Sequence, residues 1–182
     1  ALPGMELCTA EEAHVVCLFE TLEGAMDFDR YIYDNMPHIK NKAEIFGEQR
    51  ILDQDDQLTS TLEDLLLVSS FIGVDEVKAL TEQYGGTAFP AHVDRDSYSV
   101  IAALGSIPPE GGYTLAEVTR DADLPALLEH NPELKAMGIV RDSDSHYLDT
   151  LAVSQALKIS LEEPTARAVI HALQKGISGL GM

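Results

Sequence analysis

The sequence predicts an α/β domain, in which short strands alternate with helices along the chain. Short apolar runs bounded by glycine, proline or polar residues are typical of buried strands. Longer segments whose apolar residues recur three and four positions apart are typical of helices. With 182 residues, 45% of them hydrophobic, the chain can bury a core of ordinary size. We therefore expect residues 1–182 to form a single domain.

Two buried strands are expected first, at Gly4–Cys8 and Ala13–Phe19, joined by a polar turn. A helix is expected over Leu22–Asn35, where the apolar residues approximate helical spacing until Pro37 stops the pattern. Residues 38–56 are polar and irregular, which favours a long functional or lid-like connection.

Residues 50–52 within this connection are expected to form a short strand. Two helices are expected next, over Thr61–Phe71 and Val74–Tyr84, because both segments have helical periodicity. Asp75 is expected to cap the start of the second helix, and the glycine pair after Tyr84 to end it.

Three cycles of strand and helix complete the chain. The expected strands are Thr87–His92, Thr114–Val118 and Gly138–Val140, and the expected helices are Ser97–Leu104, Leu124–His130 and Pro164–Gln174. Strands that alternate with helices in this way favour a parallel α/β sheet or a barrel.

The charge of the chain limits its partners. It carries 31 acidic and 12 basic residues, a formal net charge of −19, which repels nucleic-acid backbones and anionic membranes. Long nucleic-acid duplexes and membranes are therefore not expected as partners. No apolar run approaches the ~18 residues of a membrane span, and no basic segment with a small-residue cleavage site opens the chain. We expect a cytoplasmic protein.

Carboxylates and histidines lie near the expected ends of strands, where α/β barrels gather their functional side chains. Taken singly, each is more often a surface residue or a satisfied polar residue. Together they offer the oxygen and nitrogen ligands that divalent metals take. Asp144 and His146 are two positions apart, so in an extended segment both side chains point to one face. The candidate metal ligands are Glu6, His14, His92, Asp144 and His146.

Several residues of the same chemical types are expected to lie outside this site. Cys8 and Cys17 lie inside apolar runs and do not form a disulfide framework, so both are expected to be small core residues. His38, His130 and His171 flank helices in polar surroundings, and we expect them to be structural or exposed.

Four short motifs resemble, in order, those of the PHP (polymerase and histidinol phosphatase) family of metal-dependent phosphoesterases. They are Pro3-Gly4-Met5-Glu6, His14-Val15-Val16, Ala91-His92-Val93-Asp94-Arg95 and Asp144-Ser145-His146. Two further segments also look like those of bacterial PHP-domain proteins, namely Phe46-Gly47-Glu48-Gln49 and Glu163-Pro164-Thr165 with its helix. The resemblance covers nearly the whole chain, and its specificity comes from the combination and order of the motifs.

The resemblance implies a distorted (β/α)7 barrel with a cluster of two or three divalent metal ions. Zinc, manganese, iron or magnesium would occupy the cluster, held by the five candidate ligands, with Glu6 as the bridging carboxylate. Glu6, His92 and Asp144 would be the catalytic residues. Arg95 would hold a substrate phosphate through its planar guanidinium, and a surface salt bridge is the alternative role for this side chain.

The family opens with a His-x-His motif and supplies further histidines before its Pro-Gly-x-Glu motif, and this sequence contains none of them. The resemblance therefore implies a partial domain, a barrel incomplete at its N-terminal side. Such a chain would be a fragment or would fold with a compensating partner. An open barrel edge would favour strand pairing with another copy, which gives a homo-oligomer.

The expected function is hydrolysis of phosphoesters, in a small phosphorylated metabolite or a nucleotide, by metal-activated water. The chain alone is expected to be inactive if the missing segment is required. The alternative is a non-catalytic α/β module with a vestigial or structural metal site, whose acidic surface binds a protein partner. A weaker alternative is a phosphodiesterase or nuclease that acts on nucleic-acid ends.

Overall fold

The computed structural model describes residues 1–151 and 156–175. Its central sheet has three strands in the order β1 (Gly4–Cys8), β2 (His14–Phe19) and β5 (Gly86–Pro90). Both neighbouring pairs are antiparallel, whereas the alternation of strands and helices predicts parallel pairs. The short turn between β1 and β2 explains the first pair, because a parallel pair needs a crossover of about a dozen residues or more.

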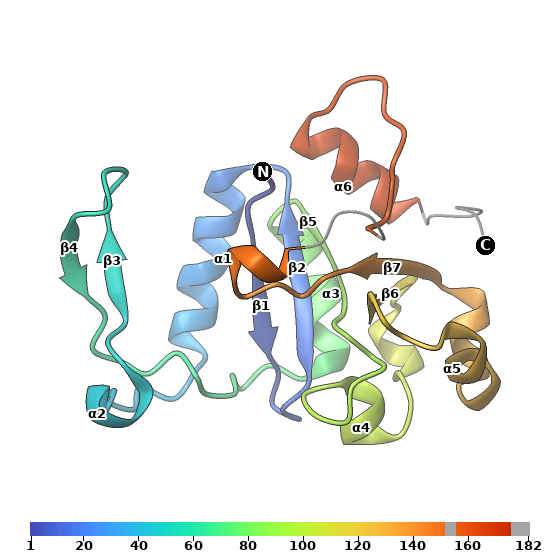
Figure 1. Ribbon diagram of the computed structural model, residues 1–182, viewed down its shortest axis with the longest axis horizontal. Helices are drawn as coiled ribbons and strands as arrows, with labels where there is room; N and C mark the ends of the chain where they lie inside the picture. The colour runs from blue at the N-terminus through green and yellow to red at the C-terminus, as the bar shows by residue number, and fades with distance from the viewer. Residues whose placement is uncertain (152–155, 176–182) are drawn as a thin grey trace.

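One face of this sheet packs against two helices, α1 (Leu22–Asp34) and α3 (Val74–Gln83) (Figure 1). Side chains alternate between the two faces of a strand, so every second residue of β2 enters this layer. The buried residues of the layer include Leu7, Val15, Cys17 and Phe19 of the sheet, Phe28 and Ile32 of α1, and Val77 of α3. They form the larger of two hydrophobic cores.

The opposite face meets β6 (Leu115–Thr119), β7 (Gly138–Asp142) and α6 (Ala166–Gln174). The β6 and β7 strands are parallel, as the sequence predicts, and α5 (Leu124–His130) lies between them in the chain. The smaller core here contains Phe89, Leu115, Val140 and Leu173. The strands β6 and β7 and the helix α6 therefore pack on the second face of the sheet.

The connection after α1 contains a short helix, α2 (Ala43–Phe46), and a hairpin of β3 (Arg50–Leu52) and β4 (Leu58–Thr61). The predicted strand at residues 50–52 is confirmed. Figure 1 shows the hairpin standing away from the central sheet. At its base, the hydroxyl of Tyr33 in α1 donates a 2.6 Å hydrogen bond to the carboxylate of Asp64.

The prediction of a helix over residues 61–71 is wrong. Apolar residues at helical spacing, such as Leu67 and Phe71, are exposed. Backbone N–H groups of this segment donate to carbonyls in other parts of the chain instead of to carbonyls within the segment. The bonds run from Leu65 to Ile39, from Ser70 to Cys8 and from Phe71 to Asn35. Because every buried backbone donor needs a partner, these tertiary bonds replace the helical ladder.

The start of α3 also differs from its prediction, because its N-cap is Gly73 and not Asp75. The side chain of Glu76 accepts a 3.0 Å hydrogen bond from the N–H of Gly73. The distant carboxylate of Glu11 accepts a 3.0 Å bond from the next N–H. Two carboxylates thus satisfy backbone donors that the helix leaves free at its first turn.

The remaining elements are α4 (Val100–Leu104) and three 3₁₀ turns, at Pro109–Gly111, Pro132–Ala136 and Leu148–Thr150. The fold is a mixed α/β arrangement, and within residues 1–151 and 156–175 its strands form three sheets that do not close into a barrel. In the same described ranges, no helix has the length and apolar character needed to cross a membrane.

Candidate metal site

The register of the β1–β2 hairpin brings Glu6 and His14 together. Cys8 lies opposite His14, and Glu6 lies opposite Val16. Alternate residues of a strand share a face, so these four side chains point away from the larger core. Diagonal neighbours across an antiparallel pair are within reach of long side chains. Nδ1 of His14 lies 2.9 Å from Oε1 of Glu6.

His92 reaches the same carboxylate from the end of β5. Its Nε2 lies 3.1 Å from Oε1 of Glu6, and the residue is buried. Its φ of 29° is in the left-handed region, which non-glycine residues rarely adopt. Neighbouring bonds hold the turn: the N–H of Ala91 donates to the carbonyl of His14 (3.0 Å), and the N–H of His92 donates to the side chain of Glu117 (3.3 Å).

Glu6, His14 and His92 form a compact group, in which one ligand atom from each residue lies within 4.8 Å of the others. Hydrogen bonds from His14 and then His92 hold the pKa of the Glu6 carboxyl well below its usual range. The pKa of His14 is raised to about 9, by hydrogen bonding with Cys8 first and with Glu6 second. The group therefore contains an ionised carboxylate at neutral pH.

This donor set fits a divalent metal ion. One carboxylate oxygen and two imidazole nitrogens suit zinc, iron or manganese, and His14 would lose its proton when it binds the metal. Magnesium prefers oxygen ligands alone. Nε2 of His92 is the ring atom that faces Glu6, while Nδ1 is buried and has no hydrogen-bond partner in the described part of the chain. Three protein ligands leave coordination positions for water or a substrate.

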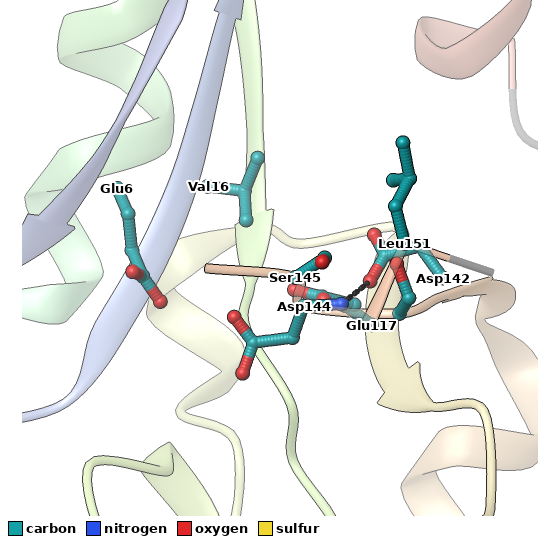
Figure 2. A pocket seen from close by; sticks show the side chains of 8 residues that line it. Glu6, Val16, Glu117, Asp142, Asp144, Ser145 and Leu151 are labelled. Atoms are coloured by element: carbon teal, nitrogen blue, oxygen red, sulfur yellow. Dashed lines mark hydrogen bonds between the residues drawn. The ribbon is translucent and has the colours of Figure 1, made fainter. Parts of the chain in front are cut away.

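A pocket of about 270 Å³ borders this group through Glu6. Its lining residues are Glu6, Val16, Glu117, Asp142, Ser143, Asp144, Ser145 and Leu151. Figure 2 shows two of these lining residues, Glu6 from β1 and Asp144 from the segment after β7. Half of the lining residues are acidic, so the pocket attracts cations.

Among the other predicted site residues, Asp144 contacts both Arg95 and His146. The guanidinium of Arg95 lies 2.7 Å from Oδ2 of Asp144, and Nε2 of His146 lies 3.3 Å from Oδ1. The side chain of Asp144 is 11% exposed, whereas that of His146 is 69% exposed. The structure thus brings Asp144 to the pocket that Glu6 lines, while His146 contacts Asp144 from the surface.

Glu117 and Asp142 also line the pocket, and the sequence reasoning missed both. Burial first, and then the neighbouring Asp142 carboxylate, raise the pKa of Glu117 well above its usual range. Glu117 is therefore held as a neutral acid at neutral pH. A signal for Glu117 was present in the sequence, because a single glutamate interrupts the apolar strand Leu115–Thr119.

The residues predicted to lie outside the site make other contacts. His38 bonds to Asp64, His130 to a carbonyl of its own helix and His171 to Glu20. Cys17 is buried in the core as predicted, and burial raises its pKa to about 12. The prediction of Cys8 as a core residue is wrong, because Cys8 is only partly buried and interacts with the site residue His14. Its Sγ also lies 3.5 Å from the hydroxyl of Ser69.

The chain is thus a mixed α/β protein with a candidate metal site at the end of its central sheet. No model of a known protein family matches the chain, and no curated protein matches it. Among solved structures, the chain is similar to the lesion-specific endonuclease PfuEndoQ from Pyrococcus furiosus, with a TM-score of 0.67 and 13% identity. The match covers 97% of this chain and 39% of that endonuclease. The two proteins share a fold.

Proposed function

We propose that the chain forms the metal-binding site of a phosphoesterase, within a distorted and partial PHP-type (β/α)7 barrel. One observation carries the proposal: Glu6, His14 and His92, which come from three strands or strand ends, direct their ligand atoms to one point. The adjoining pocket adds the carboxylate of Asp144. We propose Asp144 and His146 as further ligands from the segment after β7.

A divalent metal ion bound here would supply a Lewis acid that activates water for attack on a phosphoester. The side chains provide charge and position. Glu6 stays ionised because His14 and His92 lower its pKa. Arg95, held against Asp144, would orient a substrate phosphate with its planar guanidinium. Glu6, His92 and Asp144 are the proposed catalytic residues.

The shared fold supports phosphoester chemistry, since the similar solved structure is that of an endonuclease. The net charge of −19 opposes approach of a long nucleic-acid duplex. We therefore propose a small phosphorylated metabolite or a nucleotide as the substrate, and a location in the cytoplasm. Hydrolysis of nucleic-acid ends stays an alternative, which parallel panels of nucleotides, short single strands and sugar phosphates would distinguish.

The competing proposal is a non-catalytic module with a structural metal site that binds a protein partner. The contacts of Asp144 favour it, because Arg95 and His146 already engage both carboxylate oxygens. A structural site would bind metal and stabilise the fold without turnover.

We also propose that the chain pairs with another copy through β1. Among the described residues, β1 pairs only with β2, and it forms one edge of the sheet. Unpaired backbone groups on an edge strand offer a template for a second strand. Light scattering at several protein concentrations tests the pairing, and a monomer at every concentration would refute it.

The test of the proposed function combines metal binding with turnover. Calorimetric titration of Mn²⁺ and Zn²⁺ is compared with hydrolysis of p-nitrophenyl phosphate and bis-p-nitrophenyl phosphate. We expect binding, turnover that a chelator abolishes, and loss of both in His92→Ala. His130→Ala is the matched control, because among the residues that the structure describes His130 bonds only to its own helix. Binding without turnover would favour the structural module, and absence of binding would refute both proposals.

A further inference from the structure

The ring of Tyr98 stacks on the ring of the proposed ligand His14. Their centroids are 4.8 Å apart and the planes differ by 25°. The ring of His92 meets His14 edge-on, with centroids 5.4 Å apart and planes at 61°. Offset-stacked and edge-to-face contacts at these separations are favourable. The His14 imidazole is therefore held by two aromatic contacts as well as by its hydrogen bond to Glu6.

Tyr98 adopts an unfavourable backbone conformation at this contact. Its φ is 54°, a region where Cβ crowds the backbone and glycine is the usual residue. The residue is 55% exposed, so burial in a core does not account for an aromatic side chain there. Three of the five positive-φ, non-glycine residues in the described ranges lie at this site, namely His92, Tyr98 and Asp144. Such conformations persist where the surroundings maintain them, and they cluster at functional sites.

Hydrogen bonds fix the loop on both sides of Tyr98. The Tyr98 carbonyl accepts a 2.7 Å bond from the N–H of His14. On one side, Ser99 caps the start of α4. On the other, Asp94 accepts a 2.8 Å bond from the N–H of Thr119 in β6. Backbone and neighbouring residues thus hold the loop, and the described aromatic contact of the Tyr98 ring is with His14.

We propose that Tyr98 is a positioning residue, whose ring holds the His14 imidazole in the orientation that binds metal. The inference rests on the proposed function of Glu6, His14 and His92 as ligands. A ring that is already oriented loses less freedom when it binds a metal, and supports of this kind typically change metal affinity about 10- to 100-fold. The described contacts of Tyr98 use its ring and carbonyl and not its hydroxyl.

Two substitutions at Tyr98 separate the ring from the backbone. Tyr98→Phe keeps the ring, and we expect a dissociation constant for Mn²⁺ or Zn²⁺ within about twofold of the original. Tyr98→Gly removes the ring and relieves the strained φ. We expect it to weaken metal binding about 10-fold, while the melting temperature of the metal-free protein falls by no more than about 4 °C.

Asp56→Gly is the matched control, because Asp56 has a φ of 58° and lies in the turn of the distant β3–β4 hairpin. It relieves comparable strain and should leave metal affinity unchanged. Side-chain NMR of His14 in metal-free protein gives a second readout: the ring-current shift from Tyr98 should persist in Tyr98→Phe and vanish in Tyr98→Gly.

Equal metal affinity of Tyr98→Gly and the original protein would overturn the positioning role and leave the proposed function intact. An equal loss of metal affinity in Tyr98→Phe and Tyr98→Gly would also overturn it, because Tyr98→Phe keeps the ring and should keep the affinity. Absence of metal binding in the original protein would overturn both the proposed function and this inference.

Discussion

Oε1 of Glu6 lies 3.1 Å from Nε2 of His92, although 86 residues separate them in the chain. Glu6→Gln keeps the size of the side chain and removes its charge. We expect this variant to lose most of the metal-dependent stabilisation, because a neutral amide is a weaker ligand for a cation. A ligand at one hundred times its Kd stabilises the original protein by about 2.7 kcal/mol, which thermal unfolding with and without Mn²⁺ measures.

The matched control for this prediction is Glu63→Gln, at an exposed position on the segment after the hairpin. It should retain the full metal-dependent shift. A Glu6→Gln protein that metal stabilises as strongly as the original would show that the carboxylate is not a ligand.

Arg95 and Asp144 give a prediction about substrate binding. The side chain of Arg95 is 48% exposed, and exposed ion pairs contribute less than about 1 kcal/mol to folding. We expect Arg95→Gln to leave unfolding by denaturant almost unchanged and to raise KM for a phosphoester about tenfold. The exposed pair of Arg120 with Asp121 supplies the control: Arg120→Gln should leave KM unchanged. An unchanged KM in Arg95→Gln would show that Arg95 does not bind the substrate and only forms an ion pair with Asp144.

The charge of Asp64 is expected to make the stability of the fold depend on pH. Hydrogen bonds from Tyr33 first and Lys40 second lower the pKa of Asp64 from 3.8 to about 2. A carboxyl whose pKa is lowered by folding stabilises the protein above pH 3.8, and this contribution is lost as the pH falls from 3.8 through 2. Asp64→Asn should therefore melt at a lower temperature than the original at pH 6.

The difference between Asp64→Asn and the original should shrink as the pH approaches 2, and melting curves over this range measure it. Asp55→Asn, at the exposed tip of the hairpin, should follow the original protein at every pH. A difference that stays constant from pH 6 to pH 2 would contradict the assigned role of the Asp64 charge.

The buried side chain of Phe28 is expected to contribute strongly to the free energy of unfolding. It is fully buried, and its ring centroid lies 5.0 Å from that of Phe19 and 5.6 Å from that of Tyr84. Phe28→Ala should lower the free energy of unfolding by about 3–5 kcal/mol, because it leaves a cavity between α1 and the sheet. Phe46→Ala, at a residue that is 48% exposed, should change it by less than about 0.5 kcal/mol. Denaturant unfolding measures both, and similar losses would contradict the assigned core.

Local pattern predicted most of the regular elements. The segments 4–8, 22–35, 74–84 and 124–130 form strands and helices close to the expected bounds, because periodic apolar residues report which face is buried. The pattern failed at residues 61–71, where the N–H groups of Leu65, Ser70 and Phe71 bond to distant carbonyls. Apolar spacing carries no information about those distant partners.

The sequence by itself determined the kind of side chains available for chemistry. Five residues were predicted as a metal-binding set, namely Glu6, His14, His92, Asp144 and His146. The structure places ligand atoms of the first three within 4.8 Å of one another. Only the tertiary structure decided how they meet. The antiparallel register of β1 and β2 joins Glu6 to His14, and a left-handed backbone turns His92 toward them.

The tertiary structure also added Glu117, Asp142 and Tyr98 to the site. No local pattern distinguishes Asp142 or Tyr98, because both residue types are common on protein surfaces. The only sequence signal for Glu117 is that it interrupts the apolar strand Leu115–Thr119. Their roles come from packing: burial against Asp142 changes the pKa of Glu117, and a strained loop brings Tyr98 onto His14. Ligand chemistry follows from residue type, whereas support of the ligands depends on contacts between segments that are far apart in the chain.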